Sequence, residues 1–190
     1  MRVSHYAHNA QLISCVSIRI RRNNKFSKIG DMETPPASIA LDKLNIPHTT
    51  FQHEGSVESY EQAVQERNQR VGQVVKSILF RVRENEFALV LVAGPKPISW
   101  KILRKVLGRS RISTATEEEV LEVTGYRVGT VSPFGLKNQV RVIIEANVLK
   151  EEIVSTGSGV RNTAIIIKSA DLHQALKDAE VFELIESENL

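Results

Sequence analysis

The sequence contains a single cysteine, Cys15, among its 190 residues. One thiol excludes an internal disulfide framework, so we expect a reducing compartment, the cytoplasm. The five histidines show no metal-ligand spacing, and together with one cysteine they give no support to a structural zinc site. No apolar run approaches the ~18 residues that a membrane-spanning helix requires. We therefore expect no metal, no cofactor and no membrane partner.

Several familiar catalytic motifs are also missing. There is no Gly-x-Ser-x-Gly nucleophile elbow, no phosphate-binding loop ending in Gly-Lys-Ser or Gly-Lys-Thr, and no paired His-Glu motif of zinc proteases. The turn at Gly157-Ser158-Gly159 lacks the spacing of an elbow, and on its own it is typical of a hairpin or a bulge. The sequence thus argues against a side-chain nucleophile with a paired base.

Acidic residues are nearly absent from the first 31 positions, which hold six Lys or Arg against Asp31, a net charge of +5. Because the whole chain carries +3, residues 32–190 carry −2. A domain that binds nucleic acid over its general surface is normally basic, so a nucleic-acid partner must be held by a local patch or presented by another protein. We interpret residues 1–31 as an extension outside a single domain at 32–190. A targeting peptide and a stray strand are alternatives, and we prefer Met32 as the true start.

Five helices are predicted from apolar periodicity and capping residues. Ser56, Ser99, Thr116 and Ser169 are the expected N-caps, and Glu119 completes a capping box with Thr116. Gly108 and Gly125 are the expected C-terminal stops. The predicted helices cover 37–44, 57–68, 100–107, 117–124 and a segment that begins at Ser169.

Six strands are predicted at 48–53, 74–83, 87–93, 139–145, 153–156 and 163–168. The segment Phe87–Ala93 is apolar on both faces and should be a central strand, joined to 74–83 as an antiparallel hairpin. Short turns and helices connect the strands. The pattern therefore predicts one α+β domain with a mixed, mainly antiparallel, barrel-like sheet flanked by short helices. The acidic tail after Phe182 is expected to fray.

Lys76 is the one charge on an otherwise apolar strand face. Side chains alternate along a strand, so Lys76 shares a face with Val74, Ile78, Phe80 and Val82. Either its stem lies along the sheet and its ammonium reaches water, or the lysine points into a pocket where an anionic ligand offsets its desolvation. The sequence pattern favours neither of these two interpretations of Lys76 over the other.

Three glycines and a proline interrupt the segment Gly125-Tyr-Arg-Val-Gly-Thr-Val-Ser-Pro-Phe-Gly135. Glycine tolerates positive φ and lets a ligand approach the main chain, so such a loop can offer backbone N–H groups to a phosphate, a carboxylate or an oxyanion. A tight turn that follows a helix C-cap is the simpler interpretation of the same residues.

Taken together, these segments resemble a known family. Asp42-Lys-Leu-Asn-Ile-Pro47, Gly72-Gln-Val-Val-Lys76-Ser-Ile-Leu-Phe80 and Gly125–Gly135 are similar to motifs of the YbaK/EbsC and prolyl-tRNA-synthetase editing-domain family. The resemblance continues through Ser155-Thr-Gly-Ser-Gly159 and Ala170-Asp-Leu172, in order, over about residues 36–178. It implies a YbaK-like fold and the hydrolysis of mischarged aminoacyl-tRNA.

The resemblance also implies roles for particular residues. Lys76 would meet the phosphate of the terminal adenosine or the aminoacyl ester, and Gly129 would hold the ester carbonyl; these two are the candidate catalytic residues. The family's loop and second glycine turn imply a substrate pocket formed by Ser132, Pro133, Gly157, Ser158, Gly159 and Asn162. Asn162 lies in Arg161-Asn-Thr163, a region where subfamilies differ in their polar residue.

The leading hypothesis is a trans-editing aminoacyl-tRNA deacylase for tRNA-Pro mischarged with Ala or Cys. In the family, hydroxyls of the tRNA itself are thought to assist the attacking water, which fits the lack of a paired base. The implied partners are the 3′ end of aminoacyl-tRNA and an aminoacyl-tRNA synthetase. The alternatives are a non-catalytic module that binds tRNA ends, nucleotides or a synthetase, and a lysine enzyme that forms a Schiff base.

Overall fold

The structure, a computed structural model, describes residues 34–186. The expectations for residues 1–31 lie outside the described residues. The described helices are α1 (Pro36–Lys43), α2 (Tyr60–Glu66), α3 (Trp100–Leu107), α4 (Glu117–Thr124) and α5 (Ser169–Ala175), with short 3₁₀ turns η1 (Val71–Gln73) and η2 (Ala146–Lys150). The strands are β1 (Thr49–Gln52), β2 (Val75–Arg83), β3 (Glu86–Ala93), β4 (Ser113–Thr114), β5 (Arg141–Glu145), β6 (Ile153–Gly157), β7 (Thr163–Lys168) and β8 (Glu180–Phe182).

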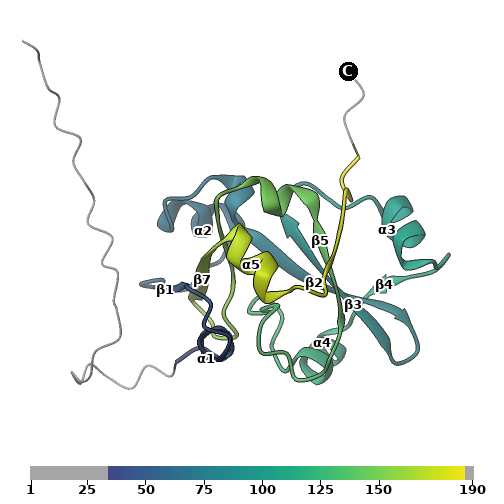
Figure 1. Ribbon diagram of the computed structural model, residues 1–190, viewed down its shortest axis with the longest axis horizontal. Coiled ribbons are helices and arrows are strands. Elements are labelled where there is room, and N and C mark those ends of the chain that lie inside the picture. Colours follow the sequence, from purple (N-terminus) through teal and green to yellow (C-terminus); the bar gives the residue numbers. More distant parts are fainter. Residues whose placement is uncertain (1–33, 187–190) are drawn as a thin grey trace, which may run out of the picture. The chain divides into compact units, whose positions relative to one another are not determined.

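The strands form two separate sheets (Figure 1). A three-stranded sheet has the order β1-β7-β6, and a five-stranded sheet has the order β4-β2-β3-β5-β8. The β3–β5 and β5–β8 pairs are parallel and the other pairs are antiparallel. The prediction of a mixed, mainly antiparallel α+β domain is confirmed, and so is the β2–β3 hairpin.

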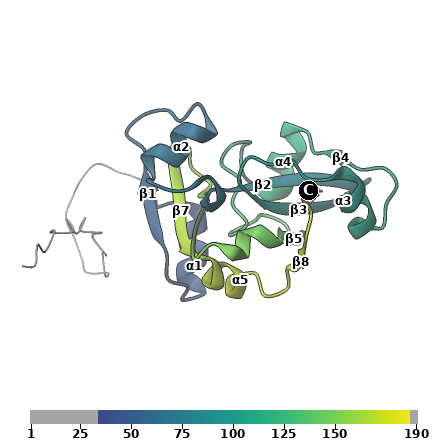
Figure 2. The ribbon, with the colours of Figure 1, turned by 90° about the horizontal axis from the view of Figure 1, so that it is seen from above.

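The expectation of a barrel is wrong for the described residues. One parallel bridge, between Val74 and Ser155, links the two sheets where β2 begins, and within residues 34–186 no strand ladder continues from one sheet into the other. Figure 2 shows β1 and β7 at one end of the domain and β2, β3 and β5 toward the other. β1 and β8 have no partner strand on their outer sides, so neither sheet closes on itself. Closure requires every strand to pair on both sides, and the short outer strands end the ladders instead.

The five-stranded sheet separates two hydrophobic cores. Val75 and Leu79 of β2 face the core shared with the three-stranded sheet, whereas Phe80 and Val82 face the core covered by α3. The predicted alternation of β2 is therefore confirmed. β3 is central and buried on both faces, as its all-apolar sequence predicted. Each fully buried Leu or Ile side chain stabilises such a core by about 1.5–3 kcal/mol.

Most helix ends follow the predicted caps. The Ser99 and Thr116 side chains accept the expected backbone hydrogen bonds, and Gly108 and Gly125 end their helices at φ 65° and 79°. Two caps were wrong. α2 begins after Ser59, whose Oγ accepts from Gln62 N at 3.1 Å, because residues 54–58 form a loop that Asn162 and Gln62 hold. At α5, Ser169 makes no cap and Lys168 occupies the N-cap position.

The segment that follows Phe182 was expected to fray, and this is wrong as far as Glu186. Residues Glu180–Phe182 pair with β5, which the sequence reading missed. Leu184 is fully buried in the core under α3, and its carbonyl accepts from Ser99 N at 2.8 Å. The acidic composition of this segment predicted fraying, but burial of Leu184 and its hydrogen bond with Ser99 hold the segment in place. No helix within 34–186 is long and apolar enough to cross a bilayer.

Candidate functional site

Lys76 lies near the start of β2, next to α2. Its Nζ is 5.8 Å from the centre of the Tyr60 ring, which fits a weak cation–π contact. Partial burial lowers the pKa of Lys76, because desolvation disfavours the charged form. Within 34–186, Lys76 has no carboxylate partner. The ammonium is therefore available to an anionic or carbonyl ligand.

Hydrogen bonds made by the Tyr60 hydroxyl fix the ring beside Lys76. The hydroxyl donates to the carbonyl oxygens of Val71 and Val74, the latter at 3.0 Å. Burial raises the pKa of Tyr60 to about 12, so the hydroxyl stays protonated at neutral pH. The ring thus holds the lysine stem against α2 without offering it a negative charge.

The two glycine turns are packed against each other. The Gly159 N–H donates to the Thr130 carbonyl at 2.9 Å. A Cβ on Gly157 would lie 2.2 Å from the Val131 carbonyl oxygen and 2.7 Å from that of Thr130. Only glycine fits at position 157, because these neighbours are backbone atoms that cannot rotate away. The two turns, which are far apart in the sequence, are therefore direct neighbours in the structure.

The structure requires glycine at position 129 for a different reason than at position 157. Gly129 has φ 86°, and a Cβ built there would meet nothing within 4 Å. Conformation rather than crowding selects glycine at this exposed position. Within the described residues, the N–H groups of Gly129, Val131 and Ser132 donate no hydrogen bond. These unpaired donors lie in the loop expected to hold a carbonyl.

Ser132 and Pro133 are buried in the same loop. The Ser132 hydroxyl accepts from Phe134 N at 3.2 Å, a local contact that shapes the turn. Pro133 lines a groove of about 780 Å³ together with residues before and within β5 and at the end of α5. Their side chains therefore support the loop, and Pro133 also borders an open surface.

Ser158 and Asn162 stabilise the second turn. The Ser158 hydroxyl is fully buried, donates to Thr163 O at 3.1 Å and accepts from Val160 N at 3.1 Å. Asn162 has φ 59°, its carbonyl accepts from His53 N at 2.8 Å, and its Oδ1 accepts from Val57 N at 3.3 Å. Both side chains are thus engaged in hydrogen bonds with backbone groups, Ser158 within its own turn and Asn162 with the loop before α2.

The strand that bears Lys76, β2, contacts the second glycine turn through the residues on either side of Lys76. Ser77 Oγ lies 3.5 Å from Thr156 Oγ1, immediately before Gly157, and the Val74–Ser155 bridge lies beside this contact. Because side chains alternate, Ser77 faces Thr156 while Lys76 points to the other side, toward Tyr60. The structure therefore places the lysine strand and both turns next to one another, but gives Lys76 no hydrogen bond to either turn.

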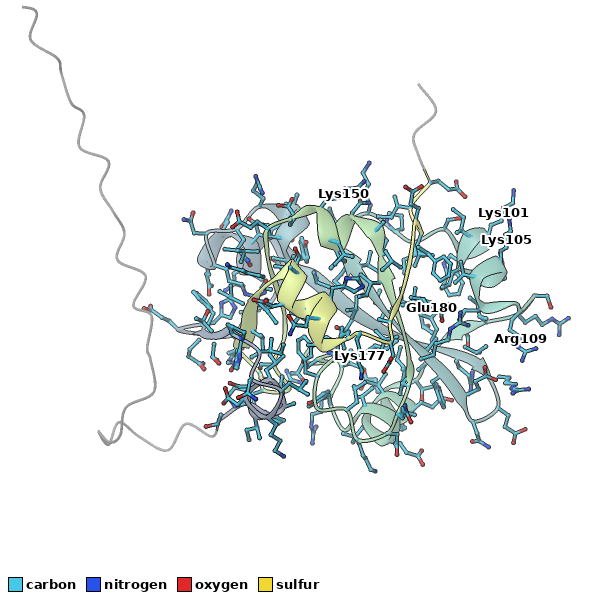
Figure 3. The ribbon with its side chains drawn as sticks, in the orientation of Figure 1. Lys101, Lys105, Arg109, Lys150, Lys177 and Glu180 are labelled. Carbon is cyan, nitrogen blue, oxygen red and sulfur yellow. The ribbon has the colours of Figure 1, made fainter. Side chains whose placement is uncertain are left out.

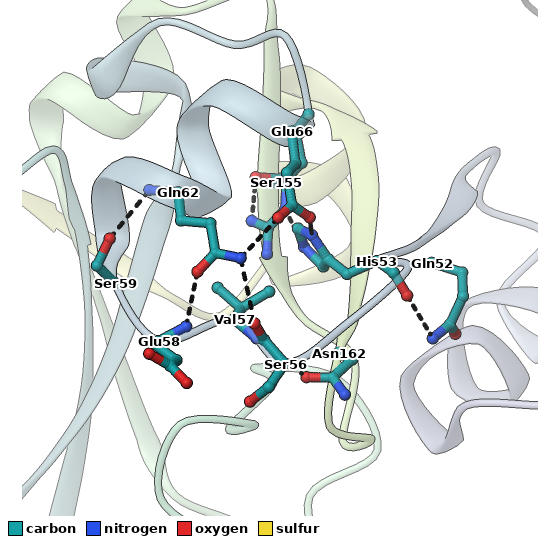
Figure 4. Close-up of polar contacts among 11 residues, drawn as sticks. Gln52, His53, Ser56, Val57, Glu58, Ser59, Gln62, Glu66, Ser155 and Asn162 are labelled. Atoms are coloured by element: carbon teal, nitrogen blue, oxygen red, sulfur yellow. Dashed lines mark hydrogen bonds and ion pairs between the residues drawn. The ribbon is translucent and has the colours of Figure 1, made fainter.

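A partly buried polar network beside the site was missed by sequence reasoning (Figure 4). Arg67 donates from Nε to His53 Nε2 at 3.1 Å and from Nη1 to Ser155 Oγ at 3.0 Å. Burial lowers the pKa of Arg67, yet a guanidinium remains a donor only. His53 Nε2 must therefore accept, which puts the ring proton on Nδ1, where it is donated to Glu66.

The sequence contained one signal for this network. Arg67 follows Tyr60 and Ala63 at helical spacing, so it lies on the inward side of α2 although it is charged. Nothing in the sequence marked His53 or Ser155 as its partners, because His53 directly follows β1 and Ser155 lies in β6, far away in the sequence. The network joins α2 to both strands and so supports the position of Tyr60 under Lys76.

Glu66 gives this network a pH dependence. The hydrogen bond from His53, and then that from Gln62, lower the pKa of Glu66 below its ordinary 4.5. Its stabilising effect is therefore present above pH 4.5 and lost as the pH falls through the lowered pKa. We expect Glu66→Gln to unfold with a weaker pH dependence than wild type in this window, measured by urea unfolding. Glu54→Gln, an exposed matched control, should keep the wild-type slope; equal slopes in all three proteins would contradict the assignment.

Within 34–186, no three His, Cys, Asp or Glu side chains are grouped to hold a metal ion. The available groups are therefore one partly buried ammonium, unpaired backbone N–H groups and two interlocked turns. Such groups can bind an anion or polarise a carbonyl.

Comparison with known proteins identifies the domain. The family described as an aminoacyl-tRNA editing domain matches residues 54–175, which include both glycine turns and Lys76. The chain is 26% identical over 163 residues to the prolyl-tRNA editing protein ProX of Acetoanaerobium sticklandii, covering 82% of this chain and 99% of that protein. It is 40% identical over 74 residues to a proline–tRNA ligase of Brachyspira hyodysenteriae, covering 39% of this chain and only 13% of the ligase.

A solved structure has the same fold. The crystal structure of a candidate trans-editing enzyme for prolyl-tRNA synthetase matches with a TM-score of 0.73 at 27% identity, covering 80% of this chain and 96% of that one. The resemblance inferred from the sequence motifs is confirmed.

Proposed function

This chain belongs to the aminoacyl-tRNA editing domain family, and we propose that it is a trans-editing deacylase for mischarged tRNA. The first candidate substrates are Ala-tRNA-Pro and Cys-tRNA-Pro, since ProX, which is similar over almost its full length, is a prolyl-tRNA editing protein. The observation that carries the proposal is the contact between the two glycine turns beside the strand that bears Lys76. A synthetase pocket discriminates one methylene by only about 1–3 kcal/mol, so a second hydrolytic step is useful.

The proposed reaction needs few side chains. Water attacks the aminoacyl carbonyl, the ester C–O bond breaks, and the terminal ribose hydroxyl of the tRNA leaves with a proton. The unpaired N–H groups around Gly129 would stabilise the developing oxyanion, an effect worth roughly 2.7–4 kcal/mol for one well-placed donor. Lys76 would attract the terminal phosphate or the ester carbonyl. A neighbouring ribose hydroxyl of the substrate would assist the water.

The remaining predicted site residues would shape the pocket. Gly157 and Gly159 let the second turn approach the first loop, and Ser158 and Asn162 hold that turn in place. Ser132 and Pro133 would fix the wall opposite the ester. His53 does not serve as the base in this proposal, because both of its ring nitrogens are engaged, by Arg67 and by Glu66.

The direct test is release of amino acid from a panel of mischarged tRNAs. We expect hydrolysis of Ala- or Cys-tRNA-Pro above the spontaneous rate and no hydrolysis of Pro-tRNA-Pro. If an aminoacyl-adenosine analogue binds but no tRNA in the panel is deacylated, the chain is a binding module and the enzyme proposal is wrong. Trapping of an adduct at Lys76 by borohydride would instead favour Schiff-base chemistry.

A further inference from the structure

The net charge of the domain is close to zero, but its positive and negative residues are concentrated in different parts of the chain. The thirty residues 87–116 contain six Lys or Arg and no Asp or Glu, a net charge of +6. Because residues 32–190 carry −2, the remainder of that range carries −8. Five of the six cations lie on α3 or in the loop that follows it, and all five are exposed: Lys101, Arg104, Lys105, Arg109 and Arg111.

These cations are almost unneutralised. Among residues 34–186, only Arg109 of the five lies near a carboxylate, at 3.9 Å from Glu86, which Arg83 also contacts. Lys101 and Lys105 are one helical turn apart and so share a face of α3. Figure 3 shows Lys101, Lys105 and Arg109 pointing outward from the end of the molecule where α3 lies. The buried side of the helix, Leu103 and Leu107, is fully used in the core, so this basic face is free.

An aromatic ring joins the basic face to the candidate site. Trp100, in the first turn of α3, is 44% exposed and packs edge-on against Phe80, with ring centres 5.5 Å apart. Phe80 and Lys76 lie on the same face of β2, four residues apart. At about 3.3 Å per residue, the strand separates them by about 13 Å.

This separation suits the single-stranded end of a tRNA. The terminal CCA and the unpaired base before it extend about 14 Å when stacked, at about 3.4 Å per nucleotide. A 3′ end seated at Lys76 would therefore bring the last unpaired bases to Trp100 and the first paired phosphates to α3. Exposed aromatic rings stack on unpaired bases, and exposed Lys and Arg bind phosphates.

We propose that Trp100 and the basic face of α3 bind the acceptor arm of the tRNA whose 3′ end occupies the candidate site. The inference rests on the proposed function, because that function is the reason for taking tRNA as the RNA that binds. It explains how a domain with a slightly negative net charge holds a polyanion: the contact is a local patch, and the acidic remainder of the surface turns other parts of the RNA away. An acidic membrane surface would also attract the cations, but it would make no use of the spacing along β2 between Lys76 and Phe80, the ring against which Trp100 packs.

The test uses the only tryptophan of the chain, Trp100, as its reporter. Uncharged tRNA-Pro is titrated into the full chain at several salt concentrations while Trp100 fluorescence is recorded. We expect quenching on binding. The double variant Lys101→Glu/Lys105→Glu should bind about tenfold or more weakly, with a salt slope reduced by about 2, one for each lost phosphate contact. Lys43→Glu/Lys177→Glu, which makes the same charge change at exposed lysines on α1 and just after α5, is the matched control and should bind like wild type.

A second measurement separates this proposal from the proposed function. An aminoacyl-CCA trinucleotide reaches the candidate site but lacks the paired stem. We expect Lys101→Glu/Lys105→Glu to deacylate the trinucleotide at the wild-type rate and full-length mischarged tRNA with a raised KM. If wild type hydrolyses neither substrate, the proposed function is wrong, while the tRNA titration still decides the α3 proposal.

The α3 proposal is overturned if the two double variants bind tRNA equally, or if Trp100 fluorescence does not respond to saturating tRNA. If Lys101→Glu/Lys105→Glu loses binding to vesicles of phosphatidylcholine and phosphatidylserine but binds tRNA like wild type, the patch is assigned to a membrane instead. Circular dichroism and thermal melting establish that both double variants remain folded.

Discussion

Replacing Lys76 by methionine is expected to lower the deacylation rate by about 10²–10³-fold, the loss typical of removing one preorganised electrostatic contact. Lys76 has no carboxylate partner among the described residues, so its charge contributes nothing to a structural ion pair. Burial lowers its pKa, which means that the charged form costs folding free energy at neutral pH. The variant should therefore unfold at the same urea concentration as wild type or a higher one.

A change on the same strand provides the matched control. Arg81 is exposed on β2 and pairs with Glu119 at 2.9 Å. Arg81→Met removes one cation and an ion pair worth about 0–1 kcal/mol, so it should leave the deacylation rate unchanged. An undiminished rate in Lys76→Met would remove the lysine from the mechanism, whatever the substrate proves to be.

Gly157→Ala is expected to destabilise the domain by about 1–3 kcal/mol or more, because the added methyl group overpacks a contact between two main chains. Its Cβ would lie 2.2 Å from the Val131 carbonyl oxygen, and relieving that clash would move the first glycine loop away from the second turn. The unpaired N–H groups of the loop would move with it. Urea unfolding should show the loss of stability, and the deacylation assay should show a loss of rate in the protein that remains folded.

Two other glycines separate crowding from conformation. Gly55→Ala adds the same methyl group where nothing lies within 4 Å and φ is not positive, so its stability should stay within about 0.5 kcal/mol of wild type. Gly129→Ala also has open space but must adopt φ 86°, so it should cost about 1–3 kcal/mol from backbone strain alone. If Gly157→Ala proves as mild as Gly55→Ala, the close contact between the two turns is wrong.

Local chemistry explains the parts of the fold that were predicted correctly. Phe87–Ala93 is apolar at every position, which is typical of a strand buried on both faces, and β3 is central. Thr116 and Glu119 satisfy each other's backbone donors within a single turn, so α4 begins where predicted. The alternation along β2 placed Lys76 correctly on the same face as Phe80. Each of these features depends on residues that are close together in the sequence.

The features that were missed depend on distant partners. Ser56 and Ser59 are equally good caps locally, and the choice between them depends on Asn162, which holds Val57 in a loop. β8 is three residues long and exists because β5 lies beside it. The network of His53 and Arg67 forms only after α2 packs on β6. The contact of Gly157 with Val131 likewise joins two loops whose closeness no local pattern encodes.

The pairing of β1 with β7 constrains how a growing chain can build this domain. β2 and β3 are joined by the two residues Glu84 and Asn85 and can pair soon after they are synthesised. β1 must wait for its partner strand, because Thr49 pairs with Ile166, which is synthesised near the end of the domain. A nascent chain that ends before β7 therefore has a lysine strand in its hairpin but lacks the sheet that positions the second glycine turn. On the proposed function, deacylation therefore requires almost the whole domain, and a nascent chain that ends before β7 should not hydrolyse the aminoacyl-tRNAs that surround it during translation.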